Sequence, residues 1–173
     1  MKSETINLHG IYQDRRQYRV PFYQRHYVWT EDEQWAPLWS DVLEKAEARR
    51  ASPGSPAPHF LGAIVLEPQP REGLKGVESF HVIDGQQRLT TLQYLLTALA
   101  MTVRERKITE LVPILDSCIW NPNPEMMNHP AIEVFKLWPT FRDRSTFEAA
   151  MKADSRDALR ARFPASFTQS GSL

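Results

Sequence analysis

The stretch 82–91 gathers polar side chains around a single glycine. In chain order, the glycine and its polar neighbours are Asp84, Gly85, Gln86, Gln87, Arg88, Thr90 and Thr91. A glycine between a strand and a helix lets the backbone approach a ligand closely, and the free amides of a first helical turn suit a phosphate group. Arg88 adds a planar fork of donors that matches phosphate oxygens. The stretch therefore predicts a phosphate-binding turn.

Each polar residue of this turn suggests a role. Asp84 is its one carboxylate, so it is the candidate base or Mg²⁺ ligand, with substrate phosphates completing the metal's shell. Gln86 and Gln87 are not acids or bases, but their amides can donate to phosphate or orient a water. Thr90 and Thr91 can supply hydroxyls in the same turn. A structural interpretation competes: Asp84 is an ordinary N-cap, worth about 1 kcal/mol, and the glutamines are solvated. The residue types leave both interpretations open.

A second stretch, 20–29, mixes aromatic side chains with an arginine. Aromatic rings beside an arginine suit stacking on a base combined with a contact to phosphate. Pro21 favours extended backbone at the start, so we expect an ordered loop. The apolar members are expected in the core: Phe22, Val28 and Trp29. The remaining members are candidate ligands: Tyr23, Gln24, Arg25 and Tyr27.

Two regular elements must hold the polar turn. Residues 80–83 have the composition of a strand, and apolar residues recur at helical spacing after the turn. The apolar positions of that helix are Leu89, Leu92, Leu95, Leu96, Leu99 and Val103. A second apolar run, 60–66, predicts another strand, and the segment 68–78 reads as an exposed connection. The resulting order is strand, tight polar turn, buried helix.

A further helix is predicted between the aromatic stretch and these strands. Thr30 and Glu33 form a capping-box pattern, and the helix should end near Arg50. Its apolar positions are Trp35, Leu38, Trp39, Val42, Leu43 and Ala46. Pro37 predicts a kink, or a helix that begins near Ala36. A linker rich in Pro, Gly and Ser follows at 51–58.

The remaining segments carry weaker patterns. Residues 8–12 give a weak strand signal, 111–120 suit a short strand or helix, 132–137 suit a strand, and 141–162 suit helix. The charged residues of 141–162 alternate in sign, which favours a solvated helix face over a nucleic-acid contact.

Composition limits the possible functions. The 21 Lys+Arg balance the 21 Asp+Glu, so a global basic field for nucleic acid is excluded and any site for a polyanion must be local. No apolar run approaches the roughly 20 residues of a membrane span. The single cysteine, Cys118, is expected as a buried apolar residue and cannot form an intramolecular disulfide. We expect a soluble, cytoplasmic protein with no membrane contact.

Several blocks, in a fixed order, resemble the N-terminal domain of GmrSD-type (type IV) restriction proteins. They are Val20–Trp29, Leu38–Asp41, His59–Val65, Val82–Leu92 and the later 136–140. Asp-Gly-Gln-Gln-Arg is the most specific mark. The resemblance implies an α+β, ParB/sulfiredoxin-like fold: a small mixed β-sheet packed with helices. We expect a ParB/sulfiredoxin-like nucleotide-binding core at 1–110 and a partly helical C-terminal extension at 111–173, which we interpret as the start of a truncated helical region because its polar end carries no capping pattern.

The resemblance implies binding and hydrolysis of a nucleoside triphosphate with Mg²⁺, coupled in the full-length protein to DNA cleavage against phage or modified DNA. The nucleotide-site motif falls on 84–88, and the upstream loop motif falls on 23–25. The HNH-type nuclease of such proteins is usually a separate domain. Here the histidines are scattered, and His129 has no second histidine at ligand spacing, so we expect the nuclease to be a partner outside this chain.

Two related chemistries are disfavoured by residue type. Sulfiredoxin carries a nucleophilic cysteine in the equivalent turn, where this chain has Gln86. A Walker A loop is absent, which excludes a P-loop mechanism.

Three functional hypotheses follow. The first is a Mg²⁺-dependent nucleoside triphosphatase that regulates the separate nuclease, with Arg25 as a second cation for the phosphates. The second is a non-catalytic nucleotide- or DNA-binding module that gates a partner nuclease, with DNA held by the full assembly. The third is a truncated remnant that folds and does neither. An aromatic loop at 23–29 would also suit contact with a second copy in a homo-oligomer.

Overall fold

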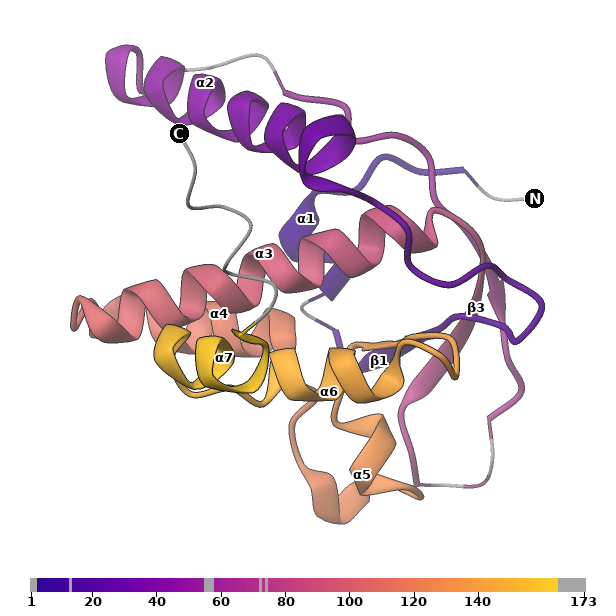
Figure 1. The fold of residues 1–173 in the computed structure, drawn as a ribbon. Coiled ribbons are helices and arrows are strands. Elements are labelled where there is room, and N and C mark those ends of the chain that lie inside the picture. Colours follow the sequence, from indigo (N-terminus) through magenta and orange to yellow (C-terminus); the bar gives the residue numbers. More distant parts are fainter. Residues whose placement is uncertain (1–2, 13, 55–57, 72, 74, 165–173) are drawn as a thin grey trace.

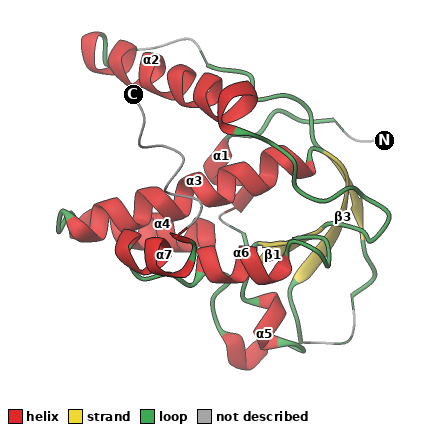
Figure 2. Ribbon diagram, viewed as in Figure 1, coloured by secondary structure: helices red, strands yellow, loops and turns green. Residues whose placement is uncertain are grey.

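The computed structural model describes residues 3–12, 14–54, 58–71, 73 and 75–164 (Figure 1). Helices make up most of its regular secondary structure, together with one small sheet (Figure 2). Its α-helices are α1 (Leu8–Tyr12), α2 (Ala36–Ala51), α3 (Gln86–Glu105), α4 (Val112–Ile119), α5 (Pro130–Glu133), α6 (Arg144–Met151) and α7 (Arg156–Arg162). Its strands are β1 (Arg16–Arg19), β2 (Val65–Pro68), β3 (Glu78–Asp84) and β4 (Leu137–Trp138). Three short turns are η1 (Glu31–Trp35), which is π-helical, and the 3-10 turns η2 (Thr109–Leu111) and η3 (Pro124–Met126).

The sheet has four strands in the order β2-β3-β1-β4. β1 runs parallel to β3 and to β4, whereas β2 runs antiparallel to β3. Tyr18 of β1 is opposite Phe80 on one side and Leu137 on the other, and it is buried. The mixed sheet with surrounding helices confirms the predicted α+β class. Because β3 is an inner strand, the turn that follows it starts from a fixed point of the sheet.

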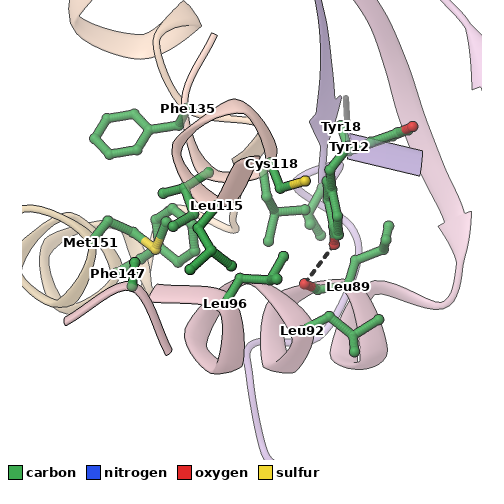
Figure 3. Close-up of a cluster of buried hydrophobic side chains, with 14 of the residues drawn as sticks. Tyr12, Tyr18, Leu89, Leu92, Leu96, Leu115, Cys118, Phe135, Phe147 and Met151 are labelled. Atoms are coloured by element: carbon green, nitrogen blue, oxygen red, sulfur yellow. Dashed lines mark hydrogen bonds between the residues drawn. The ribbon is translucent and has the colours of Figure 1, made fainter. Parts of the chain in front are cut away.

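The core forms where α3 packs on the sheet and on α4 (Figure 3). Leu89, Leu92 and Leu96 are buried as predicted, and the hydroxyl of Tyr12 donates to the backbone oxygen of Leu89 at 3.0 Å. A fully buried leucine contributes about 1.5–3 kcal/mol. The prediction was wrong for Leu99, which is 47% exposed, because none of the described residues covers that side of the last turns. The buried leucines anchor the first half of α3, including its first turn.

Residues beyond 110 complete the same core. Its members from this part of the chain are Leu115, Cys118, Ile119, Phe135, Leu137, Phe147 and Met151. β4 is also a strand of the single sheet. The expected division into 1–110 and 111–173 therefore runs through one sheet and one hydrophobic core. Cys118 is buried, as predicted from its isolation.

Three predicted strands differ from the structure for local reasons. Residues 8–12 form α1 because the Asn7 side chain accepts from the Gly10 amide at 2.7 Å and caps the turn. The strand predicted from 60 begins only at Val65, since Gly62 has a φ of +98°. The strand predicted from 132 shrinks to two residues because Pro130 starts α5.

The helix predicted after Thr30 is present, with the later start that Pro37 allows. A π-helical turn, η1, comes first, and α2 then carries Pro37 in its first turn. The side-chain oxygen of Gln34, not Glu33, accepts from the Thr30 amide at 2.9 Å, so the predicted capping box is shifted by one residue. α2 has no buried residue, although its apolar spacing predicts a buried face.

The block 136–140 is built into the fold through its backbone and one buried cation. The backbone amide of Tyr18 donates to the Lys136 carbonyl at 2.8 Å, and the backbone amide of Val20 donates to the Trp138 carbonyl at 2.9 Å. The Lys136 ammonium is buried and donates to the Asp14 carbonyl at 2.6 Å. Burial lowers the pKa of Lys136 to about 8.

Candidate functional site

The turn between β3 and α3 depends on Gly85. Its φ of +96° is left-handed, and a Cβ there would lie 3.0 Å from Ile64 Cγ1 and 3.4 Å from Arg88 Nη2. Gly85 itself occupies the N-cap position, without any side-chain cap bond. The interpretation of Asp84 as the N-cap is therefore wrong. The carboxylate of Asp84 is instead directed to Arg88.

Arg88 is held between the loop that precedes β2 and the end of β3. Its Nη2 donates to the backbone oxygen of Ala63 at 2.5 Å and pairs with Asp84 Oδ2 at 3.1 Å. A Cβ on Gly62 would meet Arg88 Nη1 at 2.1 Å, so the guanidinium lies directly against this glycine. The Arg88 Nε is buried and has no hydrogen-bond partner among the described residues. The guanidinium is positioned by the protein while part of its donor capacity is unused.

A cavity of about 230 Å³ opens beside Arg88, between α2, α3 and the loop that precedes β2. Its lining residues are Trp29, Gln34, Pro37, Leu38, Asp41, His59, Phe60, Leu61, Arg88 and Leu92. His59 Nε2 lies 3.4 Å from Asp41 Oδ2, so the second acidic group of this region already has a partner. The cavity thus combines one guanidinium, aromatic rings and a small apolar floor.

The two glutamines of the motif face the other way, toward the loop 20–29. Gln86 Nε2 donates to the Arg25 carbonyl at 2.8 Å. Gln87 Nε2 donates to the His26 carbonyl at 3.0 Å, and its Oε1 accepts from the Val28 amide at 2.9 Å. Both glutamines are buried, so the interpretation of solvated glutamines is wrong. Their side chains tie the aromatic loop to the first turn of α3.

Gln24 adds a bond from the loop to the strand: its side-chain Nε2 donates to the Ile83 carbonyl of β3 at 3.0 Å. The backbone of the loop is therefore fixed from both sides at the end of β3. This confirms the predicted ordered loop and explains its shape: the polar side chains at the turn supply the partners that a loop backbone otherwise takes from water.

The hydroxyls of Thr90 and Thr91 are turned inward. Thr90 Oγ1 donates to the Gln86 carbonyl at 2.8 Å, and Thr91 Oγ1 donates to the Gln87 carbonyl at 2.9 Å. Tyr27 joins Thr91 by a 2.6 Å bond between hydroxyls, and burial raises the pKa of Tyr27. Both threonines are buried, and neither lines the cavity beside Arg88.

The exposed tip of the loop, residues 22–25, does not line the Arg88 cavity. Tyr23 is exposed and packs edge-on against Phe22, with ring centroids 5.6 Å apart. Arg25 is exposed and also does not line that cavity. The prediction of Phe22 and Val28 as core residues was wrong, since they are 93% and 40% exposed. They lie on a loop that no helix or strand of the described part of the chain covers at these positions.

Three residues of the cavity were missed by sequence reasoning: Gln34, Asp41 and His59. Asp41 and Gln34 come from α2 and η1, and His59 comes from the segment before β2. Their types are common on surfaces, and although Asp41 and His59 lie in two of the blocks that carry the resemblance, their spacing predicts no role for their side chains. Only the folding of α2 over Arg88 brings them together.

The carboxylates suit a metal only together with a ligand. Within the described ranges, no group of three or more His, Cys, Asp or Glu is arranged to hold a metal ion. Mg²⁺ is commonly held by one or two carboxylates completed by substrate phosphates, and Asp84 offers one such group beside Arg88. The residues present therefore fit Mg²⁺ that arrives with a nucleotide. None of the described helices is long and apolar enough to cross a membrane.

Comparison with known proteins gives one family. The model of the N-terminal domain of the GmrSD restriction endonuclease matches residues 8–169. This range includes the aromatic loop, α2, the turn at 84–88 and the block 136–140. No curated protein matches the chain.

Proposed function

The chain belongs to the GmrSD restriction endonuclease N-terminal domain family, and from that premise we propose that it binds and hydrolyses a nucleoside triphosphate whose phosphates lie at Arg88. Family membership makes the chain part of a type IV restriction system and implies a nuclease domain in the full protein. We propose that this nuclease is of HNH type, that nucleotide turnover regulates its cleavage of DNA, and that the full assembly holds the DNA.

The observation that carries this proposal is the state of Arg88. Its guanidinium is fixed by Ala63 and Asp84, faces a cavity, and keeps a buried Nε without a partner among the described residues. A preorganised fork at a helix N-terminus binds phosphate strongly because the amides and the dipole add to its charge. Trp29 and Phe60 give the same cavity rings on which a base of any kind can stack.

Hydrolysis would rely on Asp84. Phosphoryl transfer needs positioning and charge neutralisation more than a strong nucleophile. Bound Mg²⁺ would neutralise phosphate charge, and Asp84 would offer it a carboxylate. Arg25 lies outside the Arg88 cavity, so a contribution of Arg25 to the phosphates would need the exposed side chain to swing inward.

Calorimetric titration of the chain with ATP, GTP, CTP and UTP in the presence of Mg²⁺ tests binding. We expect saturable heat with at least one of them, and a blank with all of them overturns the proposal. Phosphate release then tests hydrolysis. Asp84→Asn should lower the rate of release more than the affinity, and a thermal melt followed by circular dichroism controls for folding. Equal release by wild type and Asp84→Asn contradicts the role of Asp84.

One observation favours the second hypothesis, a nucleotide-binding module without turnover that gates the nuclease. Gln87 bonds to the loop backbone through both Nε2 and Oε1, and Gln86 bonds to it through Nε2, which holds both side chains toward the loop and away from the Arg88 cavity, where a water would have to be oriented. Saturable binding with phosphate release no faster than in buffer would support this hypothesis over the first.

A further inference from the structure

One face of η1 and α2 is apolar and lies open to solvent. Its members, here called the α2 seam, are Trp35, Trp39, Val42 and Ala46. Their spacings of four, three and four residues are those of a coiled-coil seam. Trp35 is 41% exposed and Trp39 is 51% exposed. Two half-exposed tryptophans on one helix face are unusual for a surface that has no partner.

Among the described residues, only the Trp35 end of this seam forms a side-chain hydrogen bond or a ring contact, and no residue of α2 is buried. The residues of η1 and α2 that line the Arg88 cavity include Gln34, Leu38 and Asp41, which lie on a different side of the helix. In Figure 1, α2 lies at the edge of the molecule, with α3 between it and α6. The indole of Trp35 donates to the Tyr27 hydroxyl at 2.6 Å, so one end of the seam is held rigidly. An exposed apolar seam with one end fixed in this way is suited to binding another helix.

The two ends of this helix differ in the sign of their terminal charges, and Asp41, Glu44, Lys45 and Glu47 lie between them. Glu31, Asp32 and Glu33 form the first turn, and Arg49 and Arg50 lie in the last turn. In an antiparallel pair, the acidic end of each helix would lie beside the basic end of the other. In a parallel pair, like charges would face each other at both ends. The charge pattern therefore makes the helix complementary to an inverted copy of itself.

We propose that two copies of this chain pair through their α2 seams, with the helices antiparallel and related by a two-fold axis. Such an isologous contact uses the same patch on both subunits, as most homodimers do. From Glu31 to Ala51 the helix is about 30 Å long. A single helix pair of this length gives a small interface, so we expect a dissociation constant of about 1–10 μM. This inference does not depend on nucleotide binding.

Sedimentation velocity of the chain across a range of concentrations tests the pairing. We expect the mass to rise from the monomer value of 20.0 kDa toward twice that value. Trp39→Glu with Val42→Glu should weaken the association by at least about a hundredfold, because charges would enter the apolar seam. The matched control is Ile114→Glu on α4, which alters an equally exposed apolar residue and should leave the association unchanged.

Charge exchange tests the antiparallel orientation. Glu31→Lys with Asp32→Lys makes both ends basic and should weaken association, and Arg49→Glu with Arg50→Glu makes both ends acidic and should do the same. All four substitutions together should restore it, because each end again faces its opposite. A monomer at every concentration overturns the proposal, including the case in which the seam binds a different protein. A dimer insensitive to the seam variants, or one that the combined exchange fails to restore, overturns it as well.

Discussion

The motif residues in the first turn of α3 lie on two sides of the helix, and the two sides have different partners. On one side, the side-chain amides of Gln86 and Gln87 form hydrogen bonds with the backbone of the aromatic loop. On the other side, Arg88 reaches a cavity and leaves its Nε without a partner among the described residues. Both sides are polar and lie within three residues of each other. The difference shows that neighbouring residues of one short polar motif can have separate roles: the glutamines hold a loop, and the arginine faces a cavity that can receive a ligand.

This division has a physical cause. Side chains on successive helical residues point in different directions, so Gln87 and Arg88 cannot serve the same neighbour. The loop at 20–29 covers the glutamine side, and α2 with the loop before β2 encloses the arginine side. If the division is correct, changes on the arginine side alter ligand affinity and changes on the glutamine side alter stability.

The largest effect is expected on the ligand side. Arg88→Ala should lower nucleotide affinity by about a hundredfold, close to 2.7 kcal/mol, because the charged fork is lost. The free energy of unfolding should change by less than about 1 kcal/mol, since the pair with Asp84 is partly exposed. Calorimetric titration and urea denaturation measure the two quantities. Arg88→Lys keeps the charge but not the planar fork, so its nucleotide affinity should lie between those of wild type and Arg88→Ala. Undiminished affinity in Arg88→Ala would contradict the assignment of the arginine side to the ligand.

The next effect is on the loop side. Gln87→Leu should lower the free energy of unfolding by about 2 kcal/mol, because the Val28 amide and the His26 carbonyl both lose their partner. Gln86→Leu removes a single bond to the Arg25 carbonyl and should cost about 1 kcal/mol. Urea denaturation compares the two variants. A greater loss of affinity than of stability in Gln87→Leu would assign this glutamine to the ligand instead.

A pH dependence sharpens the loop side further. Burial raises the pKa of Tyr27 above its ordinary value of 10.0, so the folded protein keeps a proton that the unfolded chain loses. The contribution of the protonated Tyr27 hydroxyl to the free energy of unfolding is fully present below pH 10 and is lost as the pH rises through the pKa of Tyr27 in the folded protein. Tyr27→Phe should therefore show a smaller fall in unfolding free energy above pH 10 than wild type. Denaturation at several alkaline pH values measures it, and identical slopes would show that this hydroxyl is not protected by burial.

The smallest effect is expected from Thr90. Its hydroxyl donates to the Gln86 carbonyl inside the helix, and valine has nearly the same shape. Thr90→Val should keep nucleotide affinity within about threefold, as expected for a back-bonded hydroxyl that the ligand does not use. Titration of this variant against wild type decides the matter. A drop as large as that of Arg88→Ala would place the hydroxyl on the phosphates, as the sequence predicts.

The motif and its flanking elements were predictable because their signals are local. Strand β3, the glycine turn and the buried face of α3 follow from composition and periodicity within a short stretch. The strand predicted at 60–66 was partly wrong because Gly62 has a left-handed φ of +98°, which interrupts the extended backbone where the Arg88 guanidinium packs against it. α2 was predicted as a helix but not as an exposed one, since periodicity reports an apolar face without saying what covers it.

The sequence by itself determined which chemical groups stand at the turn, that a glycine must precede the helix, and that the chain belongs with GmrSD N-terminal domains. The tertiary structure decided which of those groups are free. Gln86 and Gln87 are occupied because the aromatic loop returns to them from far away in the chain, and Arg88 faces a cavity because α2 and the loop before β2 enclose it. Such contacts join residues too distant in sequence for spacing to reveal them.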